Sequence, residues 1–154
     1  DVELVDLAEF DLPIFDEPKH PRLGDYQHEH TKRWSRSVGS ADAFVFVTPE
    51  YDYFAPPALV NALIYLSKEW AYKPAGIVSY GGISGGLRAA QSEKLLMASL
   101  SIMPIAQGVP IPMFSQYVGE DGVFRPGEPI ETGAGLMLDE LLRWAIALKP
   151  MRAA

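Results

Sequence analysis

A short apolar run that stops at a proline constrains the fold more than any other feature of this chain. Residues 43–47 are β-branched, aromatic or small, as expected for a strand buried on both faces of a sheet. Pro49 cannot donate a further ladder hydrogen bond, so we expect the chain to leave the sheet there. Prolines at 56–57 suit the first turn of a helix, and residues 58–66 carry apolar groups at helical spacing. Residues 48–54 are therefore predicted to form a loop at the carboxyl end of a strand, where open α/β sheets bind ligands.

The rest of the chain alternates in the same way between strand and helix patterns. Parallel strands need crossover connections, so this alternation predicts a parallel sheet with helices on both faces. A length of 154 residues with 48% hydrophobic content suits one α/β domain, residues 1–154. We expect further strands at 2–7, 74–80 and 103–109, and helices at 26–38, 57–70, 87–100 and 132–148.

Composition narrows the classes of partner. A formal net charge of -7 argues against nucleic acid or an anionic membrane surface as the main partner, because both would repel the chain. The absence of cysteine removes disulfides, thiolate nucleophiles and sulfur-ligated metals. No apolar run reaches the length needed to span a membrane. We expect a cytoplasmic protein.

The loop at 48–54 offers backbone polar groups, aromatic faces and two carboxylates, those of Glu50 and Asp52. This set suits a flat heteroaromatic ring such as a flavin, which needs a partly stacked apolar surround and a few fixed hydrogen bonds. A flavin carries its own redox chemistry, so we assign no catalytic residue. The alternative is a polar surface loop whose Tyr51, Tyr53 and Phe54 only pack on a neighbouring helix. Spacing alone favours neither reading.

A glycine-rich stretch at residues 79–86 is predicted to follow the next strand. Glycines let the backbone approach a ligand closely or adopt positive φ, so this loop is a second candidate for contact with the same ligand. Taken alone, the pattern favours a tight strand-to-helix turn in which Gly85 and Gly86 ease helix packing. Arg88 follows this stretch, and its side chain could contact a ligand anion or form an ion pair at the surface.

Other polar residues give weaker signals. His28 and His30 stand two apart, so on a helix they would face opposite sides and make a poor metal site, and we assign no metal ligands. Glu50 and Asp52 form a possible acid/base pair, but no histidine or nucleophile is tied to them. Ser84 lies in the glycine-rich stretch G-I-S-G-G, which the sequence favours as a strand-to-helix turn, and we assign it no nucleophilic role. Glycosidase and hydrolase chemistry are therefore disfavoured.

The two loops, in this order and separation, resemble those of the NADPH-dependent FMN reductase family of flavodoxin-like proteins. Residues 48–52 are similar to that family's T-P-E-Y-N, and residues 58–63 follow as its L-K-N-A-L does. Residues 79–82 resemble its second flavin loop. The likeness runs from about Val2 to Pro150.

This resemblance implies an oxidoreductase that passes hydride from NADPH or NADH to FMN and on to a small acceptor such as a quinone, azo compound, metal ion or free flavin. It also implies a homodimer or homotetramer. One rival is a flavodoxin-like electron carrier that does not use nicotinamide, and another is a dimerising scaffold without a cofactor. The implied FMN-binding residues are Pro49, Glu50, Tyr51, Asp52, Tyr53, Phe54, Tyr80, Gly81 and Gly82.

Two departures from the family bear on cofactor binding. Asp52 stands where asparagine is usual, and an ionised carboxylate only accepts hydrogen bonds, so we expect lower FMN affinity or a lower flavin potential. The family's phosphate loop, with its first strand and helix, has no counterpart in these residues. In the strand order 2-1-3-4-5 that strand would lie between residues 2–7 and 43–47. We expect an upstream segment or another chain to supply it, and the 154 residues alone to bind FMN poorly.

Overall fold

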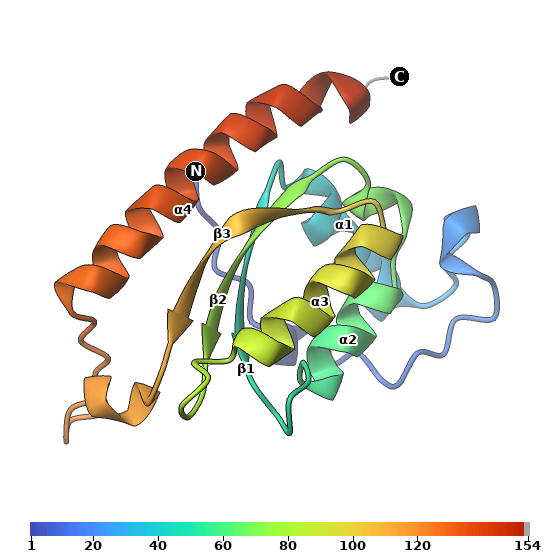
Figure 1. The fold of residues 1–154 in the computed structure, drawn as a ribbon. Helices are drawn as coiled ribbons and strands as arrows, with labels where there is room; N and C mark the ends of the chain where they lie inside the picture. The colour runs from blue at the N-terminus through green and yellow to red at the C-terminus, as the bar shows by residue number, and fades with distance from the viewer. Residues whose placement is uncertain (153–154) are drawn as a thin grey trace.

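The computed structural model describes residues 1–152 and confirms an α/β fold with a parallel sheet. The sheet has three strands in the order β1 (Phe44–Pro49), β2 (Pro74–Tyr80), β3 (Met103–Ile111), as Figure 1 shows. β2 runs between the other two and is largely buried on both faces, in keeping with its mostly apolar sequence. All three strands therefore end at one edge of the sheet.

Helices cover both faces, as predicted (Figure 1). On one face α1 (Glu29–Ser40), α2 (Pro57–Ile64) and α3 (Leu87–Ser99) enclose the larger core cluster around the fully buried Trp70. On the other face α4 (Glu128–Leu148) packs Met137 and Leu141 onto β3. Burying these side chains supplies most of the driving force for folding.

The predicted helix at 57–70 is interrupted. α2 ends at Ile64, and a short 3-10 turn, Lys68–Trp70, follows. The carboxylate of Glu69 accepts hydrogen bonds from the Tyr26 hydroxyl (2.9 Å) and the Ser35 hydroxyl (2.7 Å). These bonds to the α1 region hold the turn in place, so that Trp70 enters the core instead of continuing a helix.

The strand predicted at 2–7 is wrong. Residues 1–6 have no regular structure, and Leu7–Phe10 forms a 3-10 turn. Val2 and Leu4 are almost fully exposed. An alternating pattern gives a stable strand only where a neighbouring strand satisfies its backbone groups, and within residues 1–152 nothing pairs with this segment.

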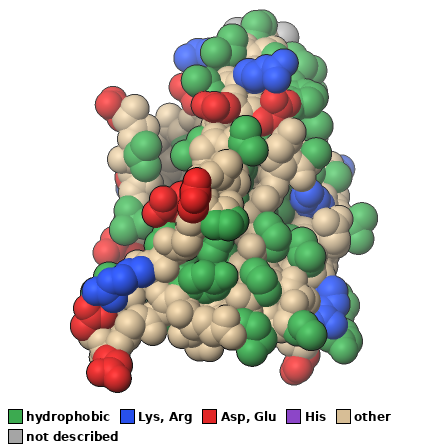
Figure 2. Space-filling model, turned by 60° about the vertical axis from the view of Figure 1, so that its left-hand side comes forward, with side chains coloured by type: hydrophobic (Ala, Val, Ile, Leu, Met, Phe, Trp, Pro, Cys, Tyr) green, Lys and Arg blue, Asp and Glu red, His purple; other side chains and the backbone are tan. Residues whose placement is uncertain are grey.

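β1 is also less covered than its sequence predicts. Val47 is 66% exposed and Val45 is exposed as well, because α4 packs on β2 and β3 and leaves β1 bare on that side. Within residues 1–152 no strand pairs with the outer edge of β1. Leu138 and Leu142 of α4 are exposed too, and Figure 2 shows hydrophobic side chains spread over the α4 side of the molecule.

None of the helices described in residues 1–152 combines the length and apolar character needed to cross a bilayer.

Candidate functional site

Three connections meet at the carboxyl edge of the sheet (Figure 1). The Glu50 amide donates to the Tyr80 carbonyl (3.0 Å), and the Gly81 amide donates to the Ile111 carbonyl (3.3 Å). The Met113 amide then bonds the Gly82 carbonyl (2.9 Å). The two loops singled out from sequence, with their residues from Pro49 to Phe54 and from Tyr80 to Gly82, therefore lie side by side.

The first loop turns sharply through a strained backbone. Tyr51 and Phe54 exchange both of their backbone hydrogen bonds, each at 2.9 Å. Between them Asp52 and Tyr53 both have positive φ, 45° and 76°, as a two-residue type I′ turn requires. Aspartate tolerates this conformation, but it is unfavourable for tyrosine. Backbone strain of this kind clusters at ligand sites, where the surroundings must hold it.

Arg88, in the first turn of α3, fixes the first loop from outside. Its side chain donates to the Glu50 carboxylate from Nε (2.8 Å), and its backbone amide donates to the same group (3.1 Å). Its guanidinium also lies 3.8 Å from the centre of the Tyr53 ring, a cation–π contact. Partial burial acts to raise the pKa of Glu50, but hydrogen bonds from Arg88 and Ser84 hold it below its ordinary value. The Glu50 carboxylate and the Glu50 amide are thus both engaged within the protein.

The glycines of the second loop divide into two kinds. Gly85 and Gly86 have φ values of 60° and 79°, and a Cβ on Gly86 would lie 2.7 Å from the Tyr80 amide nitrogen. Their packing role, predicted from sequence, is confirmed. Gly82 differs, since a Cβ there would have no atom within 4 Å. Its backbone borders open space beside the first loop.

The surface between the loops offers unused donors and exposed rings. Within residues 1–152 the amides of Asp52, Tyr53 and Gly82 donate to no protein acceptor. Phe54 is 68% exposed, and the Tyr51 side chain is exposed as well. Free amides next to exposed aromatic faces are what a planar ring with a polar edge requires, so the residues fit a flavin ring.

A cavity of about 570 Å³ lies at the opposite edge of the sheet. Its lining includes Asp42, two residues before β1, and Lys73, the residue before β2. The Lys73 ammonium donates to the Val38 and Gly39 carbonyls (2.8 and 3.0 Å) at the end of α1, so its charge has a structural role. Across residues 1–152 no three metal-ligating side chains gather into one group.

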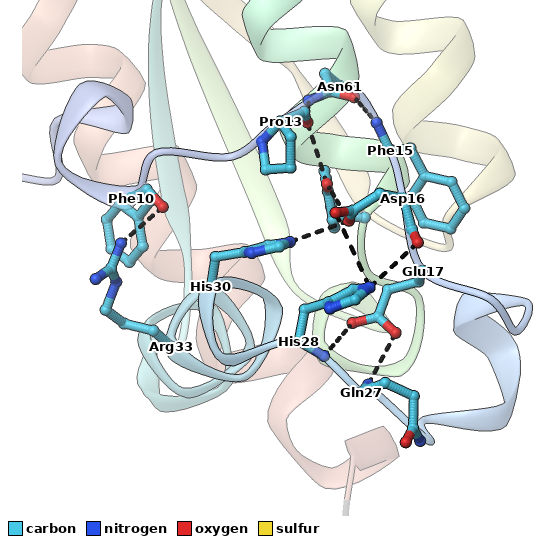
Figure 3. A network of polar contacts seen from close by, with 11 residues as sticks. Phe10, Pro13, Phe15, Asp16, Glu17, Gln27, His28, His30, Arg33 and Asn61 are labelled. Atoms are coloured by element: carbon cyan, nitrogen blue, oxygen red, sulfur yellow. Dashed lines mark hydrogen bonds and ion pairs between the residues drawn. The ribbon is translucent and has the colours of Figure 1, made fainter.

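A polar network, drawn in Figure 3, ties the segment before α1 to the helices. His28 and His30 stack at 5.2 Å, and His30 Nε2 lies 3.0 Å from the Asp16 carboxylate. The expectation that they face opposite sides was wrong, because His28 precedes the helix and has extended backbone. Asn61 donates to the Pro13 carbonyl (2.6 Å), so this residue of the family-like stretch is structural.

Sequence reasoning missed the role of Glu93. It lies on α3 between Ala89 and Met97, both fully buried, at intervals of four residues. That spacing places its carboxyl on the buried face of the helix, beside the Thr48 hydroxyl. The helical period was therefore the signal that could have found it.

Comparison with known proteins agrees with this geometry. Residues 1–116 match the family described as NADPH-dependent FMN reductase. The chain belongs to this family. It is 43% identical over 136 residues to an NAD(P)H-dependent FMN reductase of Schizosaccharomyces pombe, covering 78% of this chain and 68% of that protein.

More distant similarities extend the comparison. An NADPH azoreductase of a Bacillus species is 35% identical over 100 residues, covering 64% of this chain and 54% of the relative. A solved flavoenzyme NAD(P)H:(acceptor) oxidoreductase from Paracoccus denitrificans superposes with a TM-score of 0.70 at 20% identity, covering 89% of this chain and 76% of that one. That likeness shows the fold. The chain spans about half the length of several curated relatives it matches, 54% for the azoreductase.

Proposed function

We propose that the protein is an FMN-dependent oxidoreductase that takes hydride from NAD(P)H and passes electrons to a small acceptor. The observation that carries this proposal is the meeting of the two family loops at one edge of the sheet, with the amides of Asp52, Tyr53 and Gly82 free and aromatic side chains exposed beside them. Membership of the FMN reductase family supports the identity of the cofactor.

The residues of the chain have separable roles in this proposal. Tyr51, Tyr53 and Phe54 supply apolar faces for the flavin ring, and the free amides bond its polar edge. Pro49, Tyr80 and Gly81 shape the two loops, and Glu50 and Arg88 hold them together. When bound, FMN supplies the hydride and electron chemistry, and the protein orients it.

The exposed edge of the site leaves room for a nicotinamide and then an acceptor to reach the ring. Relatives named NADPH azoreductase and quinone reductase support azo compounds and quinones as small acceptors. We propose a homodimer or homotetramer of cytoplasmic location, and the mass measured by light scattering tests the assembly.

A fourth strand along the free edge of β1 belongs to the same proposal. The bare valines of β1 and the unpaired outer edge support it, and they agree with the order 2-1-3-4-5 if β1, β2 and β3 are its last three strands. In the protein as encoded by its gene, amide exchange should be slow at every residue of β1 from Phe44 to Thr48, since Pro49 has no amide hydrogen. Fast exchange at every second residue would contradict pairing on both sides.

The activity is tested with the protein as encoded by its gene. A yellow preparation whose visible flavin band is bleached by NADPH supports the reductase. Bleaching by dithionite or a partner protein, but not by NADPH or NADH, would instead identify an electron carrier. A colourless preparation that takes up no added FMN would overturn both.

A further inference from the structure

Glu93 is a buried carboxyl that the proposed chemistry does not use. Its side chain is 1% exposed, and Oε1 accepts a hydrogen bond from the Thr48 hydroxyl at 2.6 Å. Oε2 is buried and has no hydrogen-bond partner within residues 1–152. An ionised carboxylate with one oxygen unsolvated is costly, so the neutral acid is the form that fits this site.

The surroundings of Glu93 provide no compensating charge. α3 packs against all three strands and α2, and β1, β3 and α2 carry no ionisable side chain. β2 carries only Tyr80, whose ring lies with Phe114 and the α4-side core cluster. On α3 itself the charged residues are Arg88, bonded to Glu50, and Lys94. Burial raises the pKa of Glu93 to about 7, against the opposing effect of the Thr48 hydrogen bond.

The Thr48–Glu93 hydrogen bond joins the two elements that carry the candidate FMN loops. Thr48 is the residue before Pro49, where β1 runs into the first loop, and α3 begins directly after the second loop at Gly86. The Arg88–Glu50 pair links the same elements at the surface. The Glu93 bond is the buried counterpart of that outer link, and Thr48 is itself fully buried.

We propose that Glu93, as a neutral acid bonded to Thr48, is a positioning residue that fixes the spacing of the two FMN loops, and that loss of its proton releases this link. Ionisation places a charge on Oε2, which must then gain a donor or water, and α3 and β1 must separate to admit it. The role in FMN binding rests on the proposed function, whereas the link between the elements does not.

The test measures FMN affinity by quenching of flavin fluorescence across neutral pH, with the protein as encoded by its gene. We expect the wild-type dissociation constant to rise about tenfold as pH passes through neutrality, and that of Glu93→Gln to stay near the acidic wild-type value. Glu131→Gln, an exposed change on α4, should follow the wild-type profile. Titration of the FMN phosphate affects all three proteins alike, so an identical profile in Glu93→Gln overturns the proposal.

A second measurement decides the link without FMN. Amide exchange at Tyr51, Phe54 and Gly85 is followed against pH and corrected for the intrinsic rate. Protection should fall through neutral pH in the wild type but not in Glu93→Gln, and Glu93→Leu, which cannot bond Thr48, should show low protection throughout. If no FMN binds at any pH, the proposed function fails while exchange still supports or overturns the role of Glu93. Equal pH dependence in wild type and Glu93→Gln overturns it.

Discussion

The two loops at the carboxyl edge reach positive φ in different ways. In the first loop the residues are Asp52 and Tyr53, exposed and held by side-chain contacts such as that of Arg88 on the Tyr53 ring. In the second they are Gly85 and Gly86, packed against neighbouring backbone with no room for a Cβ. The first loop therefore presents exposed side chains and free amides at the surface, whereas the second loop is fixed by packing. Substitutions should separate ligand binding from stability along this division.

Gly86→Ala should have the largest effect. The new methyl would lie 2.7 Å from the Tyr80 amide nitrogen and the Ser79 side chain, at a φ of 79° that alanine disfavours. Overpacking and left-handed strain together should lower the free energy of unfolding by about 3–5 kcal/mol. Urea denaturation measures this loss. A loss below about 1 kcal/mol would show that the second loop is not fixed by packing.

Glu93, which links the two loops, should make stability depend on pH. Its pKa is raised in the fold from 4.5 to about 7, so its stabilising contribution is fully present below the unfolded value and is lost as pH rises through about 7. Each pKa unit corresponds to about 1.4 kcal/mol, so the loss should be about 3 kcal/mol. Urea denaturation at a series of pH values should show this decline in wild type and in Glu131→Gln. The decline should be absent in Glu93→Gln, and its persistence there would assign it to another group.

Gly82→Ala is the matched contrast to Gly86→Ala within the second loop. Its Cβ would have no atom within 4 Å, so the free energy of unfolding should change by less than about 0.5 kcal/mol. FMN affinity should fall about tenfold, because the methyl would occupy the space where we place the ring. Fluorescence titration with FMN provides the measurement. Unchanged affinity would place the ligand away from Gly82.

Asp52→Asn should have the smallest effect on stability, and it should strengthen FMN binding where Gly82→Ala weakens it. Asparagine tolerates the same positive φ, so stability should stay within about 0.5 kcal/mol of wild type. A neutral amide can donate to the flavin edge, so FMN should bind a few-fold more tightly or its potential should rise. Redox titration and FMN binding are compared with Asp139→Asn, an exposed change on α4. If both variants match wild type, Asp52 lies off the ring.

Much of the fold could be predicted because local patterns and tertiary packing agree. The strand at 74–80 has the predicted bounds, since this mostly apolar segment begins at a proline and ends before a pair of glycines. The strand predicted at residues 2–7 is absent because an alternating segment needs a neighbouring strand, and the sequence pattern does not show whether one is present. The predicted burial of β1 on both faces was wrong for a related reason, since a run of apolar residues does not show which strands α4 covers.

The location of the candidate site could be predicted from the sequence, but its side-chain contacts could not. Proline and glycine punctuation located both loops, and parallel topology brought them together. The engagement of the Glu50 carboxylate by Arg88 depends on a contact across 38 residues, which spacing cannot show. Glu93 lies at the helical period of the buried residues Ala89 and Met97, but an apolar stripe does not show which polar neighbour its carboxyl meets.

The claim that FMN binds between the two loops is tested most directly by amide chemical shifts on adding FMN to the isotope-labelled protein as encoded by its gene. We predict that the largest shifts fall at Asp52, Tyr53 and Gly82, whose amides are free in residues 1–152. Shifts centred instead on the cavity beside Asp42 and Lys73, or no shifts at saturating FMN, would contradict it.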